Sequence, residues 1–118
     1  MARQSELSAT NTSRIISAAA STNATSAKAT NGTVKMATGY NAAATARYLK
    51  FYNKTSAPTV GTDTPRKTIY LPATTAFAIQ MDDYYSQGIA YALTTGSADN
   101  DTGALTAADV LGLNVDYN

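Results

Sequence analysis

The chain has 118 residues, the size of a single domain with one modest core. Only 14% of its residues are charged and the formal net charge is +1, which argues against a nucleic-acid partner because such a partner needs a basic face. Cysteine and histidine are absent. Their absence excludes disulfides, thiolate metal sites and the Ser-His-Asp and Cys-His nucleophile systems.

The first residues carry no long apolar run, so we expect neither a signal peptide nor a membrane span. Residues 1–13 are polar and predict an extended N-terminal arm that a partner orders, while residues 14–118 predict one β-sandwich domain. Residues 14–17 predict a short strand. Residues 21–29 predict an edge strand because they offer a core nothing large.

The strongest turn signal is Asn31-Gly32, which predicts a type I′ hairpin between residues 23–30 and residues 33–40. The second of these strands alternates at a period of two, which places a common set of side chains on one of its faces. That set is Val34, Met36, Thr38 and Tyr40.

Residues 45–53 hold the densest cluster of large side chains and predict the central strand, where the core begins. Leu49 and Phe51 share one face of this half-buried strand. The opposite face is predicted to carry Tyr48, Lys50 and Tyr52.

Further strands are predicted at residues 66–71, 75–81, 88–94 and 110–117, and the last has Leu111, Leu113, Val115 and Tyr117 on one face. Between the strands we expect an Ala-rich connection at 41–45, long loops at 55–65 and 95–109, and a polar corner at 82–86. Seven or eight short strands and no convincing helix predict an all-β fold. We expect an antiparallel β-sandwich, as a jelly-roll or Ig-like variant, with a barrel as the alternative.

Carboxylate chemistry has little support in the sequence. Glu6 is the only glutamate, and Asp82 and Asp83 are neighbours whose side chains would point to opposite faces of a strand. Residues 99–103 look like a calcium loop, but the fifth, sixth and twelfth positions of an EF-hand would fall on Gly103, Ala104 and Val110. We therefore expect a turn built on Asx hydrogen bonds, with a different kind of calcium loop as the alternative.

Eight tyrosines are the remaining candidates for a site. Because tyrosine joins an apolar ring to a polar tip, these residues suit a subunit interface, plain sheet packing or a sugar site, and the sequence leaves all three open. The residues predicted at an interface are Tyr48, Tyr52, Tyr70, Tyr84, Tyr85, Arg3 and Arg14.

Four segments occur in an order that resembles a small β-rich domain recurrent in structural proteins of tailed bacteriophages. They are ARYLKFYNK at 46–54, APTVGTDTP at 57–65, GIAYALTTG at 88–96 and NVDY at 114–117. The resemblance covers roughly residues 20–118 and brings no catalytic motif. It implies a virion structural protein, and we expect no enzymatic activity.

The first functional hypothesis is a capsid decoration (cement) protein that binds the major capsid protein and stabilises the head. Such a protein would be made in the host cytoplasm, act on the capsid surface of the virion, and form a trimer or dimer. The alternatives are a structural protein of the neck, tail or baseplate and a glycan-binding module on the particle surface. No cofactor, nucleic acid or membrane is expected as a partner.

Overall fold

The computed structural model describes residues 11–118. In this range it contains eight β-strands and no helix that could cross a membrane. The strands are β1 (Asn11–Ser17), β2 (Thr25–Lys28), β3 (Gly32–Asn41), β4 (Arg47–Asn53), β5 (Lys67–Leu71), β6 (Thr75–Tyr85), β7 (Ile89–Thr94) and β8 (Val110–Tyr117). The predicted arm lies outside the described residues as far as residue 10, and residues 11–13 belong to β1.

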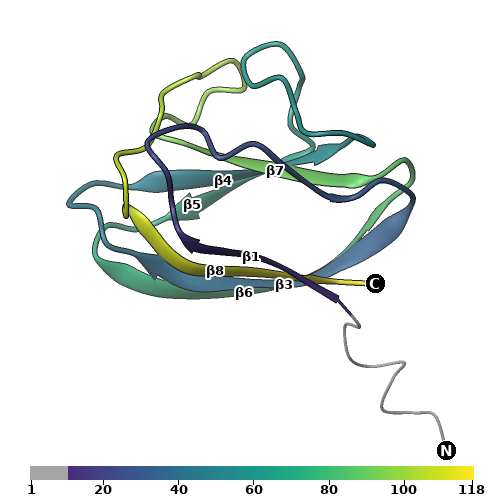
Figure 1. The fold of residues 1–118 in the computed structure, drawn as a ribbon, viewed down its shortest axis with the longest axis horizontal. Coiled ribbons are helices and arrows are strands. Elements are labelled where there is room, and N and C mark those ends of the chain that lie inside the picture. Colours follow the sequence, from purple (N-terminus) through teal and green to yellow (C-terminus); the bar gives the residue numbers. More distant parts are fainter. Residues whose placement is uncertain (1–10) are drawn as a thin grey trace, which may run out of the picture.

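The strands form two antiparallel sheets that pack face to face (Figure 1). Sheet A has the order β1-β8-β3-β6, and sheet B has the order β2-β7-β4-β5. β1 pairs with β8, β2 with β7, β3 with β6 and β4 with β5, so each pair is nested inside the previous one along the sequence. This nesting is the jelly-roll topology. The predicted antiparallel β-sandwich is therefore confirmed, in its jelly-roll rather than its Ig-like variant.

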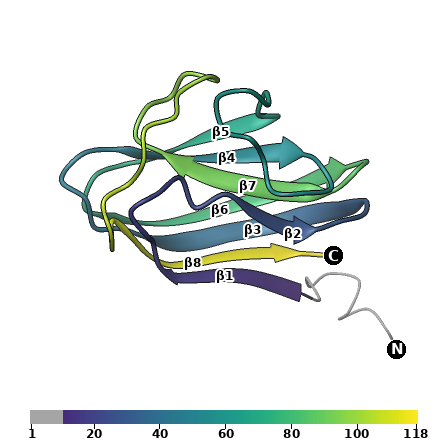
Figure 2. The same cartoon turned by 45° about the horizontal axis from the view of Figure 1, so that its top comes forward.

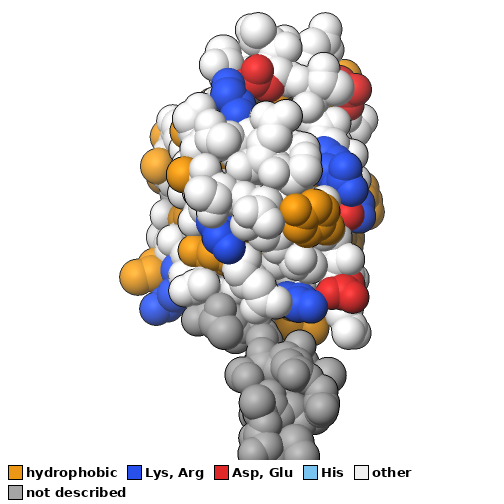
Figure 3. Space-filling view, turned by 90° about the vertical axis from the view of Figure 1, so that its right-hand side faces the viewer, with side chains coloured by type: hydrophobic (Ala, Val, Ile, Leu, Met, Phe, Trp, Pro, Cys, Tyr) orange, Lys and Arg blue, Asp and Glu red, His pale blue; other side chains and the backbone are white. Residues whose placement is uncertain are grey.

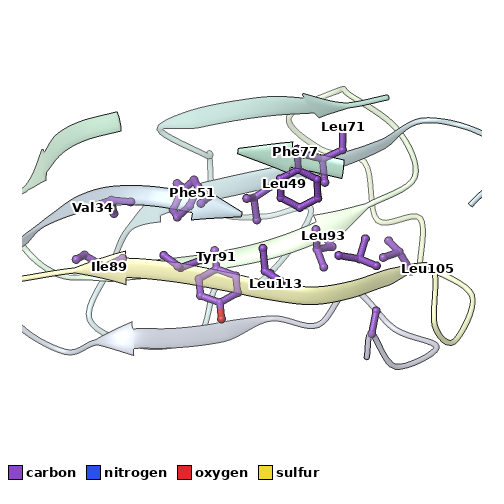
Figure 4. Packing of buried hydrophobic residues seen from close by; sticks show 14 of the residues in the cluster. Val34, Leu49, Phe51, Leu71, Phe77, Ile89, Tyr91, Leu93, Leu105 and Leu113 are labelled. Atoms are coloured by element: carbon purple, nitrogen blue, oxygen red, sulfur yellow. The ribbon is translucent and has the colours of Figure 1, made fainter. Parts of the chain in front are cut away.

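The core lies between the inner faces of the two sheets (Figure 4). Leu49 and Phe51 of β4 are both fully buried there, as predicted for the central strand. The Phe51 ring centroid lies 6.0 Å from that of Tyr91 on β7 and 6.3 Å from that of Tyr85 on β6. Because burial of a large apolar side chain contributes about 1.5–3 kcal/mol, this cluster supplies much of the force that holds the sheets together.

The hairpin predicted at Asn31-Gly32 is wrong. β2 and β3 flank this turn, but β2 pairs with β7 in sheet B, whereas β3 pairs with β6 and β8 in sheet A. A Cβ at Gly32 would lie 2.5 Å from the carbonyl oxygen of Asn118, so the close approach of the C-terminal strand requires glycine there. The chain crosses between sheets at this point, which a local turn signal does not reveal.

β-bulges change which side chains face the core in β3 and β8. The register shifts between Val34 and Met36, so Val34 is fully buried while Met36 lies on the outer face. In β8, Gly112 has a φ of 60°, and the register against β3 shifts at this point. Leu113 stays buried and Leu111 becomes 37% exposed. The single-face alignments predicted for these two strands are therefore wrong at Val34 and Leu111.

The polar corner predicted at residues 82–86 is also wrong, because β6 continues to Tyr85. Asp82 has a φ of 82° and lies at a register shift against β3. The resulting bulge turns its carboxylate outward to Lys35, with Nζ and Oδ1 2.7 Å apart. Tyr85, three residues later, is fully buried.

Candidate docking surface

No segment within residues 11–118 covers the outer face of sheet A (Figure 1). The register places residues of β1, β8, β3 and β6 side by side in three rows across this face. The rows are Ser17, Leu111, Tyr40 and Ala76; then Arg14, Asn114, Thr38 and Ala78; then Thr12, Asp116, Met36 and Gln80. We name these three rows the sheet A face.

The sheet A face is poor in charge and has an apolar end. Arg14 and Asp116 are its only charged residues. Leu111 and Tyr40 are direct neighbours across β8 and β3, and each is 37% exposed. Interfaces place few charges and many apolar or aromatic groups at their centre, because charges are costly to dehydrate. The apolar end of the sheet A face is therefore the candidate docking surface.

The outer face of sheet B is covered instead. Lys50 and Tyr52 of β4 point to this side, yet their side chains are 0% and 1% exposed. Loops formed by residues 54–66 and 95–109 lie over β4 and β7 (Figures 1 and 2). β4 is therefore buried on both faces, and the half-buried strand expected from its alternating pattern is wrong.

One anchor of this cover is Asp101 in the second loop. Its carboxylate accepts hydrogen bonds from the backbone N–H groups of Gly96 (3.3 Å) and Gly103 (2.8 Å), and the latter is the Asx bond expected from the sequence. A Cβ at Gly96 would lie 2.1 Å from the carboxylate oxygen of Asp101. Lys50 reaches the same loop from below and donates to the Ala98 carbonyl. Burial lowers the pKa of Lys50, and the nearby carboxylates oppose this shift.

The first loop has a similar anchor. Asp63 forms a salt bridge with Lys54 and accepts a hydrogen bond from the Thr59 N–H at 2.7 Å. These two bonds, the one from Lys54 first, hold the pKa of Asp63 below its usual value. Val60, in the same loop, packs against the small cluster around Tyr52. Both loops are thus pinned by a carboxylate, and the face beneath them is closed.

Charged side chains link the two sheets at their β5 and β6 edges. Asp83 on β6 lies 3.2 Å from Arg66 and 3.3 Å from Lys67, where the chain enters β5. The Arg66 guanidinium lies 5.1 Å from the centre of the Tyr85 ring. Burial alone would raise the pKa of Asp83, but the hydrogen bonds from its cationic neighbours bring it below the usual value. These contacts have a structural role at the edge of the sandwich.

The structure separates the tyrosines predicted at an interface. Tyr52 and Tyr85 lie inside the molecule, so both are withdrawn from the candidate surface. Tyr48 and Tyr70 are cross-strand neighbours on sheet B, with ring centroids 5.7 Å apart, and Tyr70 is 60% exposed. Tyr84 is 53% exposed on β6 of the other sheet. The five tyrosines therefore do not form one patch.

The two predicted arginines have different outcomes. Arg14 is exposed on β1 and belongs to the sheet A face, whereas Arg3 lies outside the described residues. The sequence analysis did not name Tyr40 and Leu111 as surface residues. Strict alternation grouped Tyr40 with Val34 and Leu111 with Leu113, and both of these partners are buried. Gly112 was the only local sign that β8 changes face.

The surface as a whole carries little charge. Figure 3 shows one end of the molecule, where positively and negatively charged side chains are scattered among uncharged and hydrophobic groups. Within residues 11–118, no three Asp or Glu side chains are placed so that they could hold a metal ion. The fold is a jelly roll in which loops cover the outer face of sheet B, and nothing within residues 11–118 covers that of sheet A. Comparison with protein-family models, curated proteins and solved structures finds no match to this chain.

Proposed function

We propose that this protein is a non-enzymatic structural protein of a bacteriophage virion, where it decorates the capsid surface and stabilises the head. It binds the lattice of the major capsid protein through the sheet A face. The observation that carries this proposal is the contrast between the two sheets. The outer face of sheet B is closed by two pinned loops, whereas no described segment covers that of sheet A, which carries Leu111 and Tyr40 at its apolar end.

The jelly roll supports the proposal because viral capsid proteins commonly use this fold, although lectins and cupins use it too. The sequence segments that resemble phage domains supply further support. They make up β4, the loop over sheet B, β7 and the end of β8. The resemblance extends over roughly residues 20–118, but its four segments lie mainly in the covered half of the sandwich. Of the sheet A face they contain only Asn114 and Asp116.

The size of the sheet A face matches repeated weak docking. Four strands spaced about 4.8 Å apart, over three rows, present about 400 Å². A standard interface buries about 800 Å² on each partner, so one such contact is weak. A decoration protein can work with weak contacts, because many copies linked to one another on a symmetric lattice bind together. This requirement agrees with the homo-oligomer expected from the sequence.

The test measures binding of purified protein to expanded capsids that lack it. Tyr40→Lys places a charge in the apolar end of the sheet A face and is expected to weaken binding about tenfold or more. Tyr70→Lys is the matched control, since this exposed tyrosine lies on the other sheet. Loss of binding with Tyr70→Lys and not with Tyr40→Lys would move the docking site to sheet B.

Cryo-electron microscopy of the intact virion tests the location. Density for this chain over the major capsid subunits is the expected result. Density confined to the portal axis or the tail would reject the decoration role and favour the neck, tail or baseplate alternative.

A glycan-binding role is a second candidate, favoured by the Tyr48–Tyr70 pair. Their rings meet edge to face, and the exposed Tyr70 ring offers an apolar surface with a polar tip of the kind that stacks on sugars. A glycan array probed with wild-type protein and with Tyr70→Ala tests it. Binding that is lost in Tyr70→Ala would support this role, and an array without signal would remove it.

A further inference from the structure

Three of the four sheet edges carry features that block pairing with another strand. β2 has only four residues and contains a register irregularity. β5 has five residues and lies between Pro65 and Pro72. β6 is interrupted by the bulge at Asp82 and carries a second carboxylate next to it. Short length, proline, bulges and charge are the usual means by which proteins protect sheet edges.

The edge formed by β1 is neither short nor interrupted by proline or a bulge. It is seven residues long, contains neither proline nor glycine, and has Arg14 as its only charge. It pairs with β8 in one register along its length. Ile16 is 71% exposed, the highest value among the large hydrophobic residues of the described chain. In Figure 2, β1 is the outermost strand of sheet A, and no described segment lies beyond it.

Two charges next to this edge have no ionic partner within the part of the chain that the structure describes. Arg14 and Asp116 belong to no salt bridge there, whereas five other basic residues pair with aspartates. Lys28 and Lys50 form no salt bridge there either, but each donates to a backbone carbonyl. Asp116 is bonded to Thr12, whose hydroxyl donates to its carboxylate at 2.8 Å. Thr12 lies opposite Asp116 in one row of the sheet A face, and Arg14 begins the next row.

We propose that the β1 edge pairs antiparallel with β1 of a second copy of this chain, about a two-fold axis at Ser13. The two A sheets then form one continuous eight-stranded sheet. In an antiparallel pair, two directly opposed residues point to the same face of the sheet. The two-fold axis must therefore lie where a residue opposes its own copy, and not between two successive residues. An axis at Arg14 would set like charges opposite each other. An axis at Ile15 would set Arg14 opposite Ile16 and leave its charge unpaired.

An axis at Ser13 gives both unpaired charges a partner. It sets Arg14 opposite Thr12 of the second copy, and Asp116 of the second copy is the next residue in that row. The two Cα atoms are then two strand spacings apart, about 9.6 Å, a span that an extended arginine and an aspartate bridge together. Two-fold symmetry repeats the contact, so both arginines and both aspartates are paired. This match of charges identifies the partner as a second copy.

The dimer is expected to be weak on its own. One strand pair buries much less than the about 1,600 Å² of a standard interface, so we expect a dissociation constant on the order of 100 μM. Dimerisation is expected of the protein by itself, and it does not depend on which particle the protein binds. On a lattice, dimerisation would place two sheet A faces side by side in one plane.

Sedimentation velocity of the full chain between about 10 μM and about 1 mM tests the proposal. Wild-type protein is expected to move from monomer to dimer. Arg14→Glu and Asp116→Lys are each expected to weaken dimerisation about tenfold or more, because two contacts change from attraction to repulsion. Asp99→Lys is the matched control, since it makes the same charge change in an exposed loop and is expected to dimerise like wild type.

The decisive measurement mixes Arg14→Glu protein with Asp116→Lys protein. In the mixed pair one contact joins the two introduced charges and the other joins the two native ones, and both have opposite signs. A dimer is therefore expected in the mixture at concentrations where each variant alone is monomeric, and it should weaken as salt is added. A wild-type protein that stays monomeric, or a mixture that stays monomeric while wild type dimerises, overturns the proposal. Circular dichroism confirms that each variant is folded.

Discussion

Removal of the Asp101 carboxylate tests how the loop of residues 95–109 is held over sheet B. Asp101→Ala deletes the acceptor for the N–H groups of Gly96 at 3.3 Å and Gly103 at 2.8 Å. A hydrogen bond to a charged group contributes about 1.5–3 kcal/mol. The bond to Gly96 is long and the Asp101 side chain is only half-buried, so solvent screening reduces the combined contribution of the two bonds. We expect the free energy of unfolding to fall by about 2 kcal/mol.

For a chain of 118 residues this loss corresponds to a decrease in Tm of about 8 °C. Urea unfolding and thermal scans measure both quantities. Asp101→Asn keeps an acceptor oxygen, so about half the loss is expected. Asp99→Ala is the matched control, because the exposed carboxylate of Asp99 accepts no hydrogen bond from residues 11–118. The free energy of unfolding is expected to change by less than about 0.5 kcal/mol in this variant. Equal losses for the two alanine variants, or a loss below about 0.5 kcal/mol for Asp101→Ala, would refute the anchor.

Three further predictions concern the core. Gly39→Ala is expected to cost about 1–3 kcal/mol, because its Cβ would lie 2.7 Å from Cζ of Phe77. Adding Phe77→Leu should recover part of that loss in urea unfolding, and purely additive losses would contradict the contact. Tyr52→Phe should leave stability unchanged or raise it by up to about 1 kcal/mol, because within the described residues the buried hydroxyl has no partner; a clear loss would mean that it has one. Burial raises the pKa of Tyr85 and Tyr91 above 10.0. The unfolded chain therefore releases tyrosine protons first, and the free energy of unfolding should fall as the pH rises above 10.0. A constant value up to about pH 12 would exclude this linkage.

Strands with a strong local pattern were predicted close to their true positions. The last strand was expected at residues 110–117 and is observed at Val110–Tyr117. The strand expected at 88–94 is observed at Ile89–Thr94. These segments succeed because runs of large or β-branched residues between glycine and polar loops favour a strand in almost any context.

Predictions that depended on pairing or on strict alternation were less accurate. A turn signal such as Asn31-Gly32 is local, and it cannot tell a hairpin from a crossing between sheets. Alternation also assumes that every residue advances the strand by one step. A bulge breaks that assumption, which is why Val34 was grouped with Met36, and Leu111 with Leu113, although the members of each pair lie on opposite faces.

The candidate surface was predicted only in part. Arg14 was named from the sequence and lies on the sheet A face. Tyr52, Tyr70 and Tyr85 are chemically identical side chains, yet Tyr52 and Tyr85 are buried and Tyr70 is exposed. Exposure of a tyrosine depends on what packs over it, and for Tyr52 that cover comes from loops that are distant in the sequence.

The sequence by itself determined that this is an all-β, low-charge sandwich without histidine or cysteine chemistry, because composition and period-two alternation act locally. Only the tertiary structure decided which sheet the loops cover, and which face and which edge no other described segment covers. Alternation gives every strand two faces, but it does not state what lies against either of them. Loops from residues 54–66 and 95–109 close sheet B, and nested pairing leaves β1 as an unprotected edge of sheet A.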